Sequence, residues 1–185
     1  NFTLGDIEVE AYDHSGYAHF DPDAPNDMYA NGIGAYENDG TLKDGALVIY
    51  LTEENKNDIS NSAYVYDEET DSYTKADITG IMQQGKYSIG YFLNNRQYAS
   101  ADRSKYGVWA ASLKYGAVDV RVVGNVSAEV SGTMDSSIEG LTAYDSTDFG
   151  GSVGDSGRMA RMVNPFNLTI EGIGEDASIY GWGVH

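Results

Sequence analysis

Residues 117–133 read AVDVRVVGNVSAEVSGT, and this stretch decides the predicted fold. Apolar residues take every second position in 118–122 and again in 126–130, which is the pattern of strands with one buried face. Gly124-Asn125 lies between the two runs and fits a tight turn. We therefore expect residues 117–133 to form one antiparallel hairpin.

The same alternation recurs along the chain and predicts further strands. It is present in residues 7–11, 87–93, 166–171 and 178–184. The run Ala46–Leu51 is apolar at every position, as expected for a central strand that is buried on both faces. Short strands separated by glycine-rich turns are typical of all-β proteins. The predicted fold is therefore all-β, an antiparallel β-sandwich of the jelly-roll or immunoglobulin-like type.

Helix is expected to be a minor component. Ser156 is placed to cap a short helix that continues to residue 163 and ends before Asn164-Pro165. Residues 52–58 are a candidate for a single helical turn, and residues 94–105 fit either a loop or a helix. We expect one or two short helices within a single domain that spans residues 1–185.

Charge is distributed unevenly along the chain, which has a net charge of -18. Residues 1–85 contain 18 of the 29 acidic residues and three lysines, whereas residues 86–121 contain six basic residues and two acidic ones. Copies with this polarity can meet head to tail. The negative surface argues against nucleic acid and anionic membranes as partners. No apolar run approaches the roughly 20 residues of a membrane span, so membrane insertion is not expected.

The cysteine content and the first residue of the chain bear on its redox environment and its targeting. The chain contains no cysteine, so it forms no disulfides and offers no thiol for catalysis or metal binding. It begins at Asn1 rather than at Met, and we interpret it as a mature protein whose signal peptide has been removed. The expected location is therefore extracellular, at the cell surface.

A loop that contains two prolines carries the candidate metal ligands. Asp21, Asp23 and Asp27 are spaced along this loop. Carboxylate oxygens in an irregular loop suit Ca²⁺, which accepts six to eight oxygen ligands. The alternative interpretation is a solvated acidic surface that keeps the protein soluble. Ca²⁺ is the candidate cofactor for this loop.

Tyrosine is abundant, with 15 residues, and two tryptophans accompany it. Half-buried Tyr suits strands, and exposed Tyr and Trp stack on sugar rings or contact protein partners. Tyr64, Tyr66 and Tyr73 flank an acidic group at residues 67–71. These features suggest an alternative function, a carbohydrate- or small-ligand-binding β module that holds Ca²⁺.

A second alternative is a secreted protein that captures haem or a metal. Tyr and His serve as axial haem ligands, and Tyr12, His14 and Tyr17 are the local candidates. Catalysis is not expected, because no nucleophile has an assignable base and no phosphate-binding glycine motif is present.

In its composition and strand pattern the chain resembles subunits of bacterial or archaeal surface fibres of the pilin or biofilm-matrix type. The resembling features are the absence of disulfides, the 22 glycines and 15 tyrosines, and the alternating strands. The resemblance implies a subunit that assembles with copies of itself by donating a terminal β-strand. Asn1–Tyr12 or Phe166–Val184 would be the donor. The assembly residues in the first of these segments are Phe2, Leu4, Ile7 and Val9.

Overall fold

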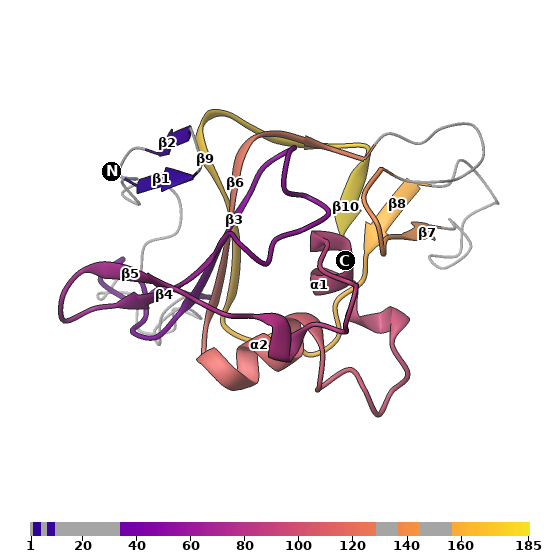
Figure 1. Ribbon diagram of the computed structural model, residues 1–185, viewed down its shortest axis with the longest axis horizontal. Coiled ribbons are helices and arrows are strands. Elements are labelled where there is room, and N and C mark those ends of the chain that lie inside the picture. The colour runs from indigo at the N-terminus through magenta and orange to yellow at the C-terminus, as the bar shows by residue number, and fades with distance from the viewer. Residues whose placement is uncertain (1, 5–6, 10–33, 129–136, 145–156) are drawn as a thin grey trace, which may run out of the picture.

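The computed structural model describes residues 2–4, 7–9, 34–128, 137–144 and 157–185. These residues form a five-stranded sheet, a three-stranded sheet and a separate two-stranded sheet, together with two short α-helices (Figure 1). The expectation of a strand-rich protein with one or two short helices is confirmed. None of the described helices is long and apolar enough to cross a membrane.

The five-stranded sheet has the order β5-β4-β3-β6-β9 and is mixed. Its strands are β3 (Leu47–Leu51), β4 (Ala63–Asp67), β5 (Ser72–Lys75), β6 (Val118–Ser127) and β9 (Leu168–Tyr180). The three strands β3, β6 and β9 are parallel, whereas β4 and β5 continue the sheet by antiparallel pairing. The antiparallel sandwich predicted from the sequence is therefore wrong for this sheet.

The predicted hairpin at residues 117–133 accounts for this error. β6 runs without reversal from Val118 to Ser127, and both of its neighbours are parallel to it. Gly124, with φ of 68°, lies at a register shift between Val123 and Asn125 instead of at a turn. A glycine in a strand produces a bulge as readily as a turn, and only the partner strands distinguish the two.

The connection between the parallel strands β3 and β6 passes through both helices. Parallel neighbours need such a crossover, because a tight turn cannot join them. α1 (Ile89–Leu93) is capped by Ser88, whose side chain accepts a hydrogen bond from the Tyr91 amide at 3.0 Å. α2 (Gly107–Tyr115) ends at Gly116, which has the left-handed φ of 77° that closes a helix.

The helices cover one face of the five-stranded sheet and create the main core. Leu47 and Ile49 of β3 and Val118 and Val120 of β6 are fully buried on this face, where they pack with residues of α1 and α2. Figure 1 shows both helices on one side of these strands. The opposite face has a smaller cluster, to which the segment 34–42 contributes.

The three-stranded sheet has the order β10-β8-β7. Its strands are β7 (Thr142–Tyr144), β8 (Gly157–Ala160) and β10 (Trp182–Val184). Gly181 connects β9 to β10 with φ of 76°, and a Cβ at this position would lie 2.5 Å from the Ala128 carbonyl oxygen. Glycine is therefore required where the chain passes from one sheet to the other.

Two local predictions are reversed. Residues 87–93 were expected to form a strand but contain α1, and residues 156–163 were expected to form a helix but contain β8. α2 was not expected at all. Residues 94–105 contain a single 3₁₀ turn, Asn95–Gln97, and residues 52–58 form turns.

The first residues form a hairpin of their own. β1 (Phe2–Leu4) pairs antiparallel with β2 (Ile7–Val9), with Phe2 opposite Val9 and Leu4 opposite Ile7. Within the described part of the chain this pair joins neither of the larger sheets. The segment predicted as one extended donor strand is therefore bent back on itself.

Candidate functional site

The outer edge of β9 is the candidate functional site. β9 is 13 residues long and ends the five-stranded sheet, and no other described strand pairs with its outer side. The Val118 amide donates to the Asn167 carbonyl at 2.9 Å, which starts the ladder with β6. In a parallel ladder alternate residues bond to each neighbour, so Leu168, Ile170 and Gly172 direct their backbone groups outward. Such an edge is a template for another strand.

The C-terminal part of this edge is apolar and exposed. Ile179 is 40% exposed and Tyr180 is 70% exposed, although the residue opposite Ile179 on β6, Val126, is fully buried. Exposed Val184 on β10 is a third apolar residue in the last part of the chain. An exposed edge with large apolar side chains is typical of a surface that another chain covers.

A bulge divides the edge into two parts. Val123 lies opposite Ile173 and Asn125 lies opposite Ser178, so β9 places four residues, 174–177, where β6 has one. Glu175 and Asp176 are exposed in this bulge. Bulges and charges limit strand addition. A single added strand therefore fits either residues 168–173 or residues 178–180.

A buried charge network lies beneath the first part of the edge. Arg121 on β6 has Tyr50 of β3 and Glu171 of β9 as its register partners. Its Nε lies 2.7 Å from Asp119 Oδ2 and 3.3 Å from Glu171 Oε1. Asp119 is fully buried, and Arg121 is 6% exposed. One guanidinium thus binds carboxylates from two neighbouring strands and fixes their register.

Tyrosine hydroxyls complete the network. The Tyr36 hydroxyl lies 2.9 Å from Asp119 Oδ2 and 2.5 Å from Glu171 Oε1, and its single proton can be donated to either acid. Arg121 Nη1 donates to the hydroxyls of Tyr50 at 2.8 Å and Tyr73 at 3.3 Å. The guanidinium carbon also lies 5.5 Å from the centre of each of these two rings, which is within the range of cation–π attraction.

Burial shifts the protonation of these groups. Burial raises the pKa of Asp119 to about 8, with Glu171 acting in the same direction and Arg121 opposing it. Burial also raises the pKa of Tyr36, and the two carboxylates raise it further, so the hydroxyl remains a donor. Burial lowers the pKa of Arg121, but Asp119 together with Tyr50, Tyr73 and Tyr36 outweighs this effect and leaves the pKa raised. The network contains an acid that holds its proton near neutral pH.

The network attaches the segment 34–42 to the sheet. Besides the Tyr36 contacts, the Ala35 amide donates to the Thr169 hydroxyl of β9 at 3.0 Å. A Cβ at Gly34 would lie 2.2 Å from the same hydroxyl, so the backbone approaches β9 closely there. These contacts attach the segment to the start of β9, where a Cβ at Gly34 would also lie 2.8 Å from the Leu168 carbonyl oxygen.

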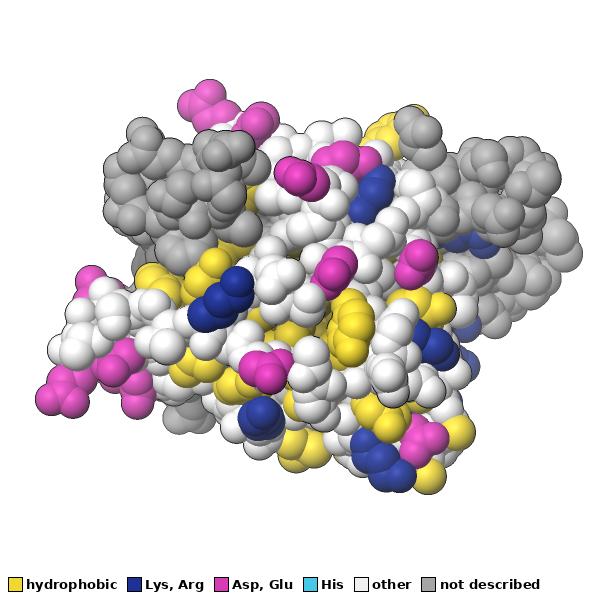
Figure 2. All heavy atoms as spheres, in the orientation of Figure 1, with side chains coloured by type: hydrophobic (Ala, Val, Ile, Leu, Met, Phe, Trp, Pro, Cys, Tyr) yellow, Lys and Arg dark blue, Asp and Glu magenta, His cyan; other side chains and the backbone are white. Residues whose placement is uncertain are grey.

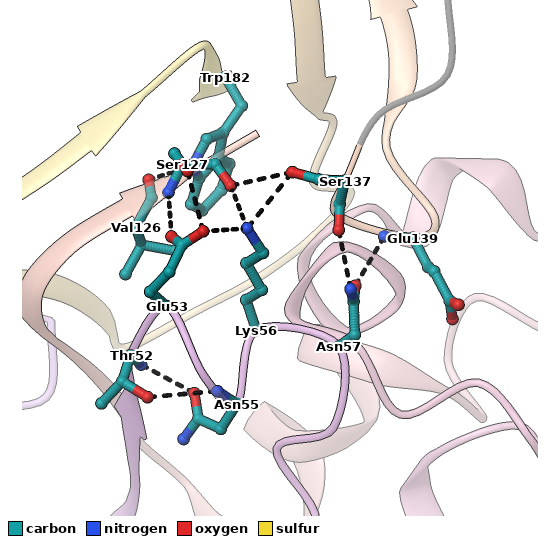
Figure 3. A network of polar contacts seen from close by, with 10 residues as sticks. All are labelled: Thr52, Glu53, Asn55, Lys56, Asn57, Val126, Ser127, Ser137, Glu139 and Trp182. Atoms are coloured by element: carbon teal, nitrogen blue, oxygen red, sulfur yellow. Dashed lines mark hydrogen bonds and ion pairs between the residues drawn. The ribbon is translucent and has the colours of Figure 1, made fainter. Parts of the chain in front are cut away.

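A second polar network supports the other end of β6 (Figure 3). Glu53 accepts hydrogen bonds from the Ser127 amide at 2.6 Å and the Ser127 hydroxyl at 2.9 Å. Lys56 pairs with Glu53 and donates to the Ser127 carbonyl at 2.8 Å. The Trp182 indole donates to the Val126 carbonyl at 3.0 Å. The strand residues that pair with Ile179 and Tyr180 are therefore fixed from two sides.

The same network joins the turn after β3 to residues 137–139. Asn57 Nδ2 donates to the Ser137 carbonyl at 2.7 Å, and Asn57 Oδ1 accepts from the Glu139 amide at 2.9 Å. Figure 3 shows Asn57 pointing toward both residues. The contacts join segments about 80 positions apart, so the network is a structural clamp.

Opposite charges lie at different ends of the described surface. In Figure 2 acidic side chains surround the tip of the β4–β5 hairpin, and basic side chains lie near the connection from α1 to α2. The tip contains Asp67, Glu68 and Glu69, which are exposed. Arg96 and Lys105 are exposed in the connection. Arg121, by contrast, is buried and adds nothing to a basic surface.

The tyrosines beside the acidic group mainly pack against other aromatic residues. Tyr66 lies 5.2 Å from Tyr73 between ring centres, and Tyr64 lies 6.1 Å from Tyr50. The Tyr66 hydroxyl donates to Asp71 at 3.0 Å. This packing is the strand role that half-buried tyrosine commonly has.

The sequence-predicted ligands lie outside the described residues. This applies to Asp21, Asp23 and Asp27, and also to Tyr12, His14 and Tyr17. The described residues contain no group of three or more His, Cys, Asp or Glu that could hold a metal ion.

The assembly residues lie in the separate hairpin: Phe2 and Leu4 are in β1, and Ile7 and Val9 are in β2. Sequence reasoning missed the buried network. The sequence feature that could have indicated this network is a pair of charged residues, Asp119 and Arg121, at alternate positions of a valine-rich strand.

Comparison with protein-family models gives no match, and comparisons with curated proteins and with solved structures give none either.

Proposed function

We propose that the chain is an extracellular structural subunit that assembles with copies of itself by β-strand addition at the outer edge of β9. The observation that carries the proposal is the length of this edge. β9 has 13 residues and pairs on one side only among the described strands. Backbone hydrogen bonds to such an edge give affinity, and apolar contacts along it give specificity.

The N-terminal segment is the proposed donor. A two-stranded hairpin of three residues a strand is marginally stable by itself, so opening β1–β2 costs little. Residues 2–9 would extend to about 26 Å as one strand, which is longer than the roughly 20 Å of β9 residues 168–173. Phe2, Leu4, Ile7 and Val9 would supply the apolar contacts. The alternative donor, Phe166–Val184, already pairs with β6 and β8 within its own chain.

Charge polarity gives the contact a direction. The acidic tip of the β4–β5 hairpin and the basic α1–α2 connection are different surfaces, so a contact between them is head to tail. Head-to-tail contacts that do not close on themselves produce filaments. Because both surfaces are exposed, salt screens this contribution over about 8–10 Å.

The test compares the full chain with a version that lacks residues 1–12. Light scattering and negative-stain microscopy should show filaments for the full chain and particles of 20.0 kDa or less for the truncation. Adding the isolated 1–12 peptide to the truncated protein should then occupy the β9 edge with a 1:1 stoichiometry. If the full chain remains a monomer across salt and calcium concentrations, the proposal is wrong.

A further inference from the structure

Arg158 is a buried arginine that takes no part in the proposed assembly. It lies on β8, in register with Ala143 of β7 and Trp182 of β10. Arg158 is 5% exposed. Side chains alternate along a strand, so Arg158 points to the same side as Ala160, which is fully buried in the main core. A cationic side chain therefore points to the apolar side of the small sheet.

Among the described residues, the guanidinium of Arg158 has no counter-ion. Its Nε and Nη2 atoms are buried and have no hydrogen-bond partner, and no ion pair joins it to a carboxylate in the described ranges. Arg121, the other fully enclosed arginine in these ranges, differs in this respect. It has two carboxylates and two tyrosine hydroxyls around it.

The guanidinium of an arginine carries a permanent positive charge in proteins. An unpaired buried charge is strongly unfavourable, and the usual remedy is an anion that accepts its hydrogen bonds. Nε–H and one Nη2–H point in the same direction, along one edge of the guanidinium. That edge matches the two oxygens of a carboxylate in the bidentate arrangement. The atoms without partners on Arg158 are the two donors of this edge.

We propose that Arg158 binds the carboxylate group of a small ligand through its Nε–Nη2 edge. Trp182 lies opposite Arg158 in register, so the two side chains share a face of the small sheet. The indole N–H of Trp182 already donates to the Val126 carbonyl, so Trp182 offers the ligand no hydrogen-bond donor. Ala160 lies on the same face, so the described neighbours on this strand and the next are apolar. The site therefore selects a monocarboxylate with a short apolar remainder.

The test is a titration of the full chain, observed through its arginine side chains. The chain has five arginines, so ¹H–¹⁵Nε correlation spectra are simple to follow. Acetate and butyrate replace chloride at constant ionic strength and pH. We expect the Arg158 Nε signal to move downfield with saturation, at lower concentration for butyrate than for acetate. The signal is assigned by backbone-to-side-chain correlation, so the wild type alone decides the outcome.

Arg158→Met and Arg96→Met form the matched pair of variants. Arg96 is exposed, so its replacement leaves the butyrate response unchanged. Butyrate should raise the Tm of the wild type and of Arg96→Met, because a ligand that binds only the folded state stabilises it. Arg158→Met should show no butyrate-dependent increase in Tm. An Arg158 signal that does not saturate, or an equal Tm increase in Arg158→Met, would overturn the proposal.

Discussion

Arg121 Nε donates to Asp119 Oδ2 across 2.7 Å, and the two residues lie two positions apart on the same buried strand. The period of a strand places both side chains on one face. Glu171 joins them from β9, directly opposite Arg121. The result is one cation beside two carboxyl groups, and the Tyr36 hydroxyl lies within hydrogen-bond distance of both. The pair β6–β9, on which the proposed assembly edge depends, is joined by these contacts.

Replacement of Arg121 should destabilise the fold strongly. Arg121→Met removes the cation that the buried Asp119 and the neighbouring Glu171 share. Breaking a buried pair in this way costs about 3–5 kcal/mol of the free energy of unfolding. Urea denaturation at pH 7 measures the loss. Arg96→Met is the control, since an exposed arginine should change stability by no more than about 0.5 kcal/mol.

Asp119 should make stability depend on pH. Its folded-state pKa is raised to about 8, above the ordinary value of 3.8, so the folded state binds the proton more tightly. Its contribution is fully present below about pH 4 and is lost as the pH rises toward 8. Asp119→Asn should therefore flatten the pH dependence of the free energy of unfolding between pH 4 and 8. Equal slopes in the variant and the wild type would show that Asp119 does not titrate in this range.

Period-two alternation in the sequence located the faces of the sheet correctly. Val118 and Val120 lie in the main core, and Asp119 and Arg121 lie on the other face, as their spacing requires. The direction of the partner strands was not available from this pattern, because alternation is the same in parallel and antiparallel strands. Glu171, fifty residues further along the chain, could not be assigned to Arg121 without that pairing.

Local signals of strand and helix were also ambiguous where segments are short. Residues 87–93 alternate well enough for a strand, yet Ser88 caps a helix there. Gly90 lets this helix pack closely against residue 139, since a Cβ at Gly90 would lie 2.1 Å from the Glu139 carbonyl oxygen. This close approach depends on a segment fifty residues away. Tertiary contacts of this kind override weak local preferences.

The polar clamp at the end of β6 should depend on Glu53. Glu53→Ala removes the acceptor for both Ser127 donors and the partner of Lys56. Because Glu53 is about half exposed, we expect a loss of only about 1–2 kcal/mol in the free energy of unfolding. Its neighbour Glu54 is also exposed, so Glu54→Ala is the control. If both variants lose the same stability, the clamp does not contribute.

The last prediction concerns the edge itself. Ile179→Lys places a charge on the exposed apolar part of β9, and lysine on an edge strand opposes the addition of another strand. Leu113→Lys is the matched control, because Leu113 is 58% exposed but lies on α2, away from the edge. Both replacements affect exposed side chains, so both variants should keep the thermal stability of the wild type. Light scattering should show at least a tenfold rise in the concentration needed for assembly with Ile179→Lys, and little change with Leu113→Lys.

An Ile179→Lys variant that assembles normally would restrict strand addition to residues 168–173. Ile170→Pro would then test this other half of the edge, because it removes an N–H that points outward. Assembly that survives both edge variants would contradict strand addition at β9.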